Sequence, residues 1–184
     1  MIDLEIVTPP ASEPVALDRV KQHLRIEHGD EDVLLTAYLS AARLLVEDMT
    51  GRALAAQTIR ELRDAFPEGA APIELLRVPV TSVDEVRYVL ADGTERVLDS
   101  SAYVVREERL VVPTSSWPTD DVMRVRITYK TGSYMTPVLE QAVAWMAALM
   151  YEQRLPIITS TIVRDVPMPL GLRSLLSAEK RYIC

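Results

Sequence analysis

The spacing of apolar residues predicts two helices near the start of the chain. After an extended lead that contains prolines, apolar residues three and four positions apart predict a short amphipathic helix over 17–26. A wider apolar stripe predicts a longer helix over 31–50. Asp30 stands where an N-cap belongs, and Gly51 supplies the residue expected just past the C-terminus.

The apolar period changes to two over residues 55–131, and turn residues recur at short intervals. We interpret this region as an antiparallel β-meander. Asp92-Gly93 predicts a tight hairpin between two of its strands. One later strand has a solvated, basic face and a buried face, the latter formed by Met123, Val125, Ile127 and Tyr129.

A third helix is predicted to run to Arg154, with Thr136 as its N-cap and Pro137 at its first position. This helix is apolar nearly all round over 142–150, so it is either the centre of the core or shared with another subunit. Four of its side chains are assigned to core or subunit packing in preference to a ligand pocket: Trp145, Met146, Leu149 and Met150.

These patterns together predict an α+β fold, with a helical core of three main helices plus a C-terminal helix. The β-meander is inserted between the second and third helices. We expect a single domain over 1–184, made of N-terminal helices (1–54), an inserted β region (55–132), a core helix (133–154) and a C-terminal docking arm (155–184). Prolines keep the start of the arm extended, and a short amphipathic helix ends it.

Composition excludes several classes of protein. The hydrophobic content of 48% favours an ordered globule, and the longest apolar run, 142–150, is shorter than the roughly 20 residues that a membrane-spanning helix needs. Residues 1–5 do not resemble a signal peptide, so we expect synthesis in the cytoplasm. With Cys184 as the single cysteine and two histidines, we expect neither a disulfide nor a structural zinc site, and no cofactor.

No catalytic constellation emerges from the sequence. The acidic run 30–32 lacks the alternating ligands of a calcium loop, and His23 and His28 have no nucleophile or paired carboxylate at motif spacing. The adjacent carboxylates at 107–108 and 120–121 are expected to point apart. We therefore predict that the chain is not an enzyme.

Several sequence segments, taken in their order along the chain, resemble the head–tail connector (adaptor) proteins of long-tailed bacteriophages, prophages and gene transfer agents. The resemblance covers residues 13–154. It is carried by the segments 13–25, 30–32 and 47–54, by 78–83 and the hairpin at 88–93, and by 125–132 leading into a helix that ends Tyr151-Glu152-Gln153-Arg154. The shorter members are mostly helical, so the β insertion departs from the minimal pattern.

The resemblance implies a structural subunit, located in the virion or phage-like particle at the head–tail junction and assembled in the bacterial cytoplasm. It implies a homo-oligomeric ring, a dodecamer, that docks beneath the portal protein, continues the DNA channel and receives a tail-completion or stopper protein. DNA would pass without specific binding, because an acidic surface repels phosphate. The net charge is −7, and residues 1–54 carry −5 of it.

Two sets of residues follow as expectations. Acids expected to approach the channel are Glu27, Asp30, Glu31, Asp32, Glu47 and Asp48. Apolar residues expected to dock on the portal are Leu170, Leu172, Leu175, Leu176, Tyr182 and Ile183, unless the terminal helix folds back on its own subunit. A non-viral binding module or accessory subunit is the alternative function, and a hydrolase or transferase is a second one that lacks a polar cluster to support it.

Overall fold

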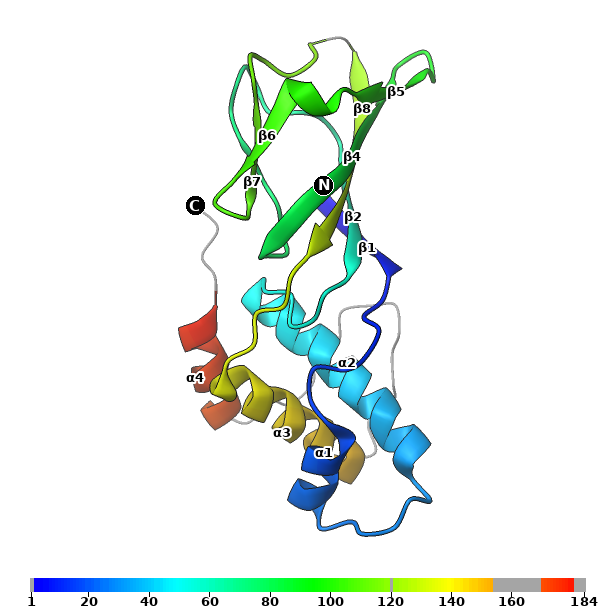
Figure 1. Ribbon diagram of the computed structural model, residues 1–184, viewed down its shortest axis with the longest axis vertical. Helices are drawn as coiled ribbons and strands as arrows, with labels where there is room; N and C mark the ends of the chain where they lie inside the picture. Colours follow the sequence, from blue (N-terminus) through cyan, green and yellow to red (C-terminus); the bar gives the residue numbers. More distant parts are fainter. Residues whose placement is uncertain (1, 120, 154–169, 181–184) are drawn as a thin grey trace. The chain divides into compact units, whose positions relative to one another are not determined.

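The computed structural model describes residues 2–119, 121–153 and 170–180, and its elements confirm an α+β chain (Figure 1). The chain divides into two compact units. The β unit contains residues 2–11 and 55–134, and the helical unit contains the described residues among 12–54 and 135–180. The N-terminal segment therefore joins the β unit instead of accompanying the N-terminal helices.

The helical unit consists of α1 (Leu17–Leu24), α2 (Asp32–Thr50), α3 (Pro137–Gln153) and α4 (Leu170–Glu179). α2 packs against α3, and both of these helices contact α1 and α4. All four helices were predicted, α3 from its Thr136-Pro137 start and its apolar run and the other three from apolar spacing. Their inward faces supply a core that includes Val20, Leu35, Leu39, Ala42, Val46, Leu139, Val143, Met146, Leu172 and Leu176.

The helix ends follow the predicted signals with one exception. Gly51 closes α2 with a left-handed φ of 70°, and the Thr136 hydroxyl accepts a hydrogen bond from the Leu139 amide at 3.2 Å. The prediction of Asp30 as N-cap of α2 is wrong. Glu31 holds that position without a side-chain cap, and the Asp32 carboxylate instead pairs with Lys21 at 2.7 Å.

The β unit contains a five-stranded antiparallel sheet in the order β1-β2-β8-β4-β5. Its strands are β1 (Ile2–Thr8), β2 (Thr58–Arg63), β4 (Val80–Leu90), β5 (Glu95–Leu98) and β8 (Val122–Thr131). A three-stranded sheet, in the order β3-β7-β6, is built from β3 (Ile73–Glu74), β6 (Tyr103–Arg106) and β7 (Leu110–Pro113). A short 3-10 turn, Ser100–Ala102, precedes β6.

The predicted meander is wrong in its strand order. β8 lies between β2 and β4, so strands that are neighbours in sequence are not always neighbours in the sheet. Periodicity of two tells which side of a strand is buried, but it does not tell which strand is its partner. The extended lead also proves to be an edge strand, β1, which pairs with β2 from Ile2↔Arg63 onward.

The buried face of β8 agrees with the prediction at three positions and differs at one. Val125, Ile127 and Tyr129 are fully buried, whereas Met123 is 65% exposed. The β4–β5 hairpin forms as predicted, with Gly93 at φ 85° and the Leu90 amide donating to the Thr94 carbonyl at 2.9 Å.

Candidate functional site

The turn between α1 and α2 contains most of the acidic residues that were predicted to approach the channel. Glu27 and Asp30 are exposed. Glu31 is half-buried and accepts a hydrogen bond from the Tyr151 hydroxyl of α3, and Asp32 is half-buried beside Lys21. The turn therefore presents carboxylates to solvent, and their approach to a channel stays a prediction.

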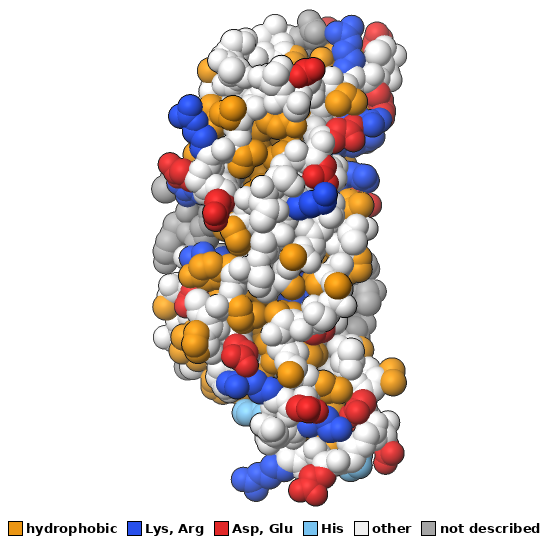
Figure 2. Space-filling model, viewed as in Figure 1, with side chains coloured by type: hydrophobic (Ala, Val, Ile, Leu, Met, Phe, Trp, Pro, Cys, Tyr) orange, Lys and Arg blue, Asp and Glu red, His pale blue; other side chains and the backbone are white. Residues whose placement is uncertain are grey.

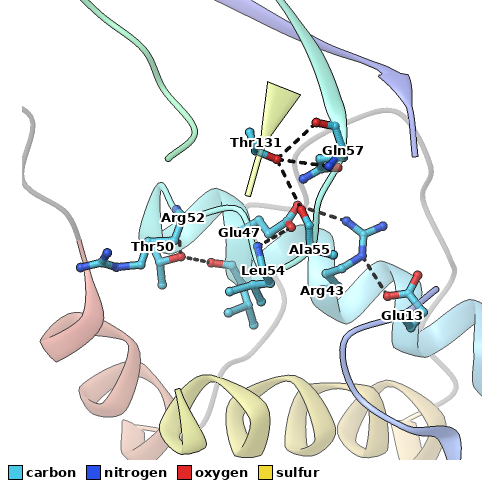
Figure 3. Close-up of polar contacts among 10 residues, drawn as sticks. Glu13, Arg43, Glu47, Thr50, Arg52, Leu54, Ala55, Gln57 and Thr131 are labelled. Atoms are coloured by element: carbon cyan, nitrogen blue, oxygen red, sulfur yellow. Dashed lines mark hydrogen bonds and ion pairs between the residues drawn. The ribbon is translucent and has the colours of Figure 1, made fainter. Parts of the chain in front are cut away.

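Glu47 does not belong to that set of exposed acids. Its side chain is 2% exposed, its Oε2 pairs with Arg43 at 3.1 Å, and its Oε1 accepts a hydrogen bond from the Leu54 amide at 2.9 Å (Figure 3). The expectation that Glu47 faces a channel is wrong, because it was based on charge and ignored the face of the helix. Asp48, one residue on, is exposed.

Arg43 is the centre of this buried network in the helical unit. Its side chain is 3% exposed, and it contacts two carboxylates: Glu47 one turn along α2, and Glu13 in the lead to α1 at 2.9 Å (Figure 3). A buried guanidinium needs such partners, because an unpaired charge in the core is costly. The network ties the segment before α1 and the segment after α2 to the middle of α2.

The β unit has its own buried carboxylate, Glu61 on β2. It accepts hydrogen bonds from the Leu76 amide at 2.9 Å and Arg63 Nε at 2.8 Å, and the Tyr129 hydroxyl donates to it at 3.4 Å. Burial, reinforced by the negative charge of Glu61, raises the pKa of the Tyr129 phenol well above its ordinary value. The sequence pattern does not reveal this group, since alternation alone does not distinguish a buried Glu from a solvated one.

The outer face of the five-stranded sheet carries a network of paired charges. Arg60 pairs with Glu5 at 3.2 Å, and Glu95 contacts both Arg87 at 3.1 Å and Arg126 at 3.0 Å. The hydrogen bond from Arg87 and the nearby Arg126 lower the pKa of the Glu95 carboxyl.

A shallow polar depression on this face is lined by Arg60, Glu85, Arg87, Arg126 and Thr128. The basic face predicted for β8 is thus largely neutralised by acids of neighbouring strands, and Figure 2 shows blue and red side chains adjoining over the β unit.

α4 packs on its own helical unit, which is the alternative that the sequence left open. Leu172 and Leu176 are buried, and Leu175 is 37% exposed. The Glu179 carboxylate accepts a hydrogen bond from Thr136 at 3.2 Å, and its backbone carbonyl accepts one from Arg52 at 3.1 Å. Docking on a portal stays a prediction. The Leu170 side chain, Tyr182 and Ile183 lie outside the described residues.

α3 is the central helix of the helical unit. Met146 and Met150 are buried, while Trp145 and Leu149 are half-buried. Gly171 of α4 packs against Trp145, and a Cβ added at Gly171 would be in ordinary van der Waals contact with the indole ring at 3.5 Å. The two methionines therefore lie in the core of the helical unit.

The residues weighed for chemistry are dispersed. His23 and His28 are both exposed, and His28 lies 3.6 Å from the Asp30 carboxylate. Glu107 and Glu108 form the turn of the β6–β7 hairpin. Within the described ranges, no three His, Cys, Asp or Glu side chains gather as a metal site would require, and no helix there is long and apolar enough to cross a bilayer.

Comparison with known proteins gives a family match over the first half of the chain. Residues 14–87, which span α1, α2 and the first strands of the inserted region, match the phage gp6-like head-tail connector protein family. This confirms the resemblance drawn from the sequence. No match was found among curated proteins.

Solved structures extend the likeness to almost the whole chain. A chain in the neck of an empty gene transfer agent (GTA) particle, computed with C6 symmetry, is 26% identical, with a TM-score of 0.74 over 99% of this chain and 97% of that one. A chain in the neck of a native GTA particle, computed with C12 symmetry, is 25% identical, with a TM-score of 0.72 over 99% and 97%. A native GTA virion contains a chain of 25% identity and TM-score 0.74, over 98% and 96%.

Proposed function

We propose that this chain is a structural head–tail connector subunit of a phage-like particle, and that it joins the capsid to the tail. The observation that carries the proposal is the agreement of two independent findings: a connector domain over residues 14–87 and a fold shared over 99% of the chain with a GTA neck protein. The β insertion, which departs from the shorter connectors, is included in that shared fold. The function is mechanical, so it requires surfaces for assembly and no reaction centre.

The subunits form a ring. The similar chains lie in necks with C6 and C12 symmetry, which supports a dodecamer for this chain. A ring of identical subunits needs a heterologous interface, in which one patch of each copy meets a different patch of the next. The ring assembles in the bacterial cytoplasm and takes its place at the head–tail junction.

The ring continues the DNA channel without gripping DNA. Glu27, Asp30 and Asp48 are exposed carboxylates, and phosphate is repelled by such a surface. Arg60, Arg87 and Arg126 of the sheet's outer face are paired with glutamates, so these three offer little free positive charge. Duplex DNA should therefore bind weakly in fluorescence anisotropy at physiological ionic strength, and tight binding with a steep salt dependence would contradict this part of the proposal.

The neighbours are a portal protein on one side and a tail-completion or stopper protein on the other. Because Leu172 and Leu176 are buried in the helical unit, Leu175 is the one that α4 presents to solvent among the described side chains of the predicted docking set. Leu175→Glu should weaken binding to the portal, whereas Ser177→Glu, which adds the same charge at another exposed position of α4, should not.

The deciding experiment uses the purified full-length chain. Light scattering after size-exclusion chromatography and negative-stain images should show a closed ring, alone or on addition of the portal protein from the same particle. Co-elution with the portal is the expected result. A chain that stays monomeric in both conditions would contradict the connector function and favour an unrelated binding module.

A further inference from the structure

The outward face of α2 is unusually apolar for a surface helix. The buried side of α2 includes Leu35, Leu39, Ala42 and Val46. On the opposite side, Val33 is 87% exposed and Leu34 is 41% exposed. One, two and three turns further on, the same side presents half-buried Ala37, then Ser40 and Ala41, then Leu44. We call these six residues, 33, 34, 37, 40, 41 and 44, the α2 strip.

The α2 strip contains no charged side chain. Asp32 and Asp48 flank it, and the two charged residues between them, Arg43 and Glu47, turn inward and pair with each other in the core. By contrast, the outward face of the neighbouring α1 carries Asp18, Arg19, Gln22 and His23, which is the usual composition of a solvated face. A helix that is apolar on all sides is normally covered on all sides.

We propose that the α2 strip is a contact between neighbouring copies of this chain in the ring. The inference rests on the proposed function, because it assigns one of the two patches that a heterologous ring interface requires.

Charge supports a second copy as the occupant. Each chain carries −7, so two copies repel wherever their acidic surfaces meet. Four turns of α2 without an exposed charge give a like-charged partner a place to approach closely, and the small side chains of Ala37, Ser40 and Ala41 let its backbone come near. Figure 2 shows hydrophobic side chains on the visible surface of the helical unit, with charged ones gathered towards its α1 end.

The first test adds a charge to the α2 strip. Ala37→Glu and Ala41→Glu should preserve the subunit, because both positions are partly exposed and Glu is a good helix former. Each should raise the chain concentration needed for half-maximal ring formation by at least about tenfold, since a buried unpaired carboxylate costs more than one factor of ten in association. Gln22→Glu is the matched control: it adds the same charge on exposed α1 and should leave ring formation unchanged.

The outcomes separate the two proposals. If the wild type forms rings and both α2 variants form them equally well, the inference is overturned and the connector function stands. If the wild type forms no ring with or without portal, the connector function fails and the inference fails with it. If the α2 variants lose their helical circular dichroism or melt far below the Gln22→Glu control, the strip is covered within its own chain, and the inference is also overturned.

A crosslinking experiment identifies the occupant directly. Ala41→Cys in a Cys184→Ser background carries a benzophenone label, and the assembled ring is irradiated. Our inference requires covalent dimers and higher multiples of this chain. Crosslinks confined to a single chain, for example from Ala41 to residues 154–169, would show that the chain covers its own α2 strip and would overturn the inference.

Discussion

At the scale of single residues, each unit of the chain contains a buried carboxylate, Glu47 in the helical unit and Glu61 in the β unit. The sequence contains 27 acidic residues, and charge counting treated those of the N-terminal part as one surface feature. Glu47 and Glu61 are instead buried, each with an arginine partner and a backbone amide to satisfy it. Their burial depends on which side of a helix or strand they occupy, and the apolar pattern around them is too continuous to show that side.

Glu47→Ala should destabilise the helical unit severely. The change removes one of the two carboxylates of buried Arg43 and the acceptor of the Leu54 amide. We expect a loss of about 3 kcal/mol in the free energy of unfolding by urea, because buried Arg43 keeps only Glu13 as a partner and the buried Leu54 amide loses its acceptor. Glu27→Ala, at an exposed acid, should change stability by less than about 0.5 kcal/mol. Equal, small effects at both positions would contradict the buried network.

The turn of the β6–β7 hairpin stores backbone strain that one substitution should release. Glu107 and Glu108 both have φ near 52°, a left-handed conformation that costs a residue with a Cβ roughly 1–2 kcal/mol. Glu108→Gly should therefore raise the free energy of unfolding by about 0.5–1 kcal/mol, after the entropic cost of glycine is subtracted. Glu108→Ala removes the same carboxylate and keeps the Cβ, so it should give no gain. A gain of equal size from alanine would show that charge, and not strain, was relieved.

At the scale of elements, helices were predicted closely because their signals are local. The spacing of apolar residues, Gly51 past α2 and Pro137 at the start of α3 all act within a few residues, and the observed bounds differ from the predicted ones by only one or two positions. The strand region 55–131 was also predicted, but the edge strand β1 was not, and the predicted strand order was wrong. The placement of β8 between β2 and β4 depends on contacts between distant parts of the chain, which no local pattern encodes.

α4 provides the element-scale prediction. Leu172 is fully buried in the helical unit, while Leu175, one turn on, is 37% exposed. Leu172→Ala should lower the free energy of unfolding by about 2–5 kcal/mol, as deletion of a buried leucine does. Leu175→Ala should cost less than about 1 kcal/mol, because the side chain already has partial access to water. Thermal melts of the two variants give the comparison. Similarly small losses for both would show that α4 is not held on its own unit and would favour a free docking arm.

At the scale of the whole molecule, charge and apolar surface act in opposite directions on assembly. A net charge of −7 on every copy disfavours a closed ring, while the uncharged α2 strip and paired charges on the sheet reduce that repulsion locally. The sequence alone predicted the excess of apolar surface but assigned it to α3. In the structure, α3 lies in the core because the helices that contact it enclose it. The excess apolar surface lies on α2 instead.

This balance predicts that salt strengthens the ring. Added salt shortens the range of repulsion between acidic copies, from a Debye length of about 30 Å at 0.01 M to about 10 Å at 0.1 M, and it does not weaken apolar contacts. The ring fraction, measured by analytical ultracentrifugation at fixed protein concentration, should therefore rise with sodium chloride across this range. Ion pairs between copies would give the opposite slope, since salt weakens attraction between exposed opposite charges. A ring that dissociates as salt increases would thus show that charge pairs, and not the α2 strip, dominate the contact between subunits.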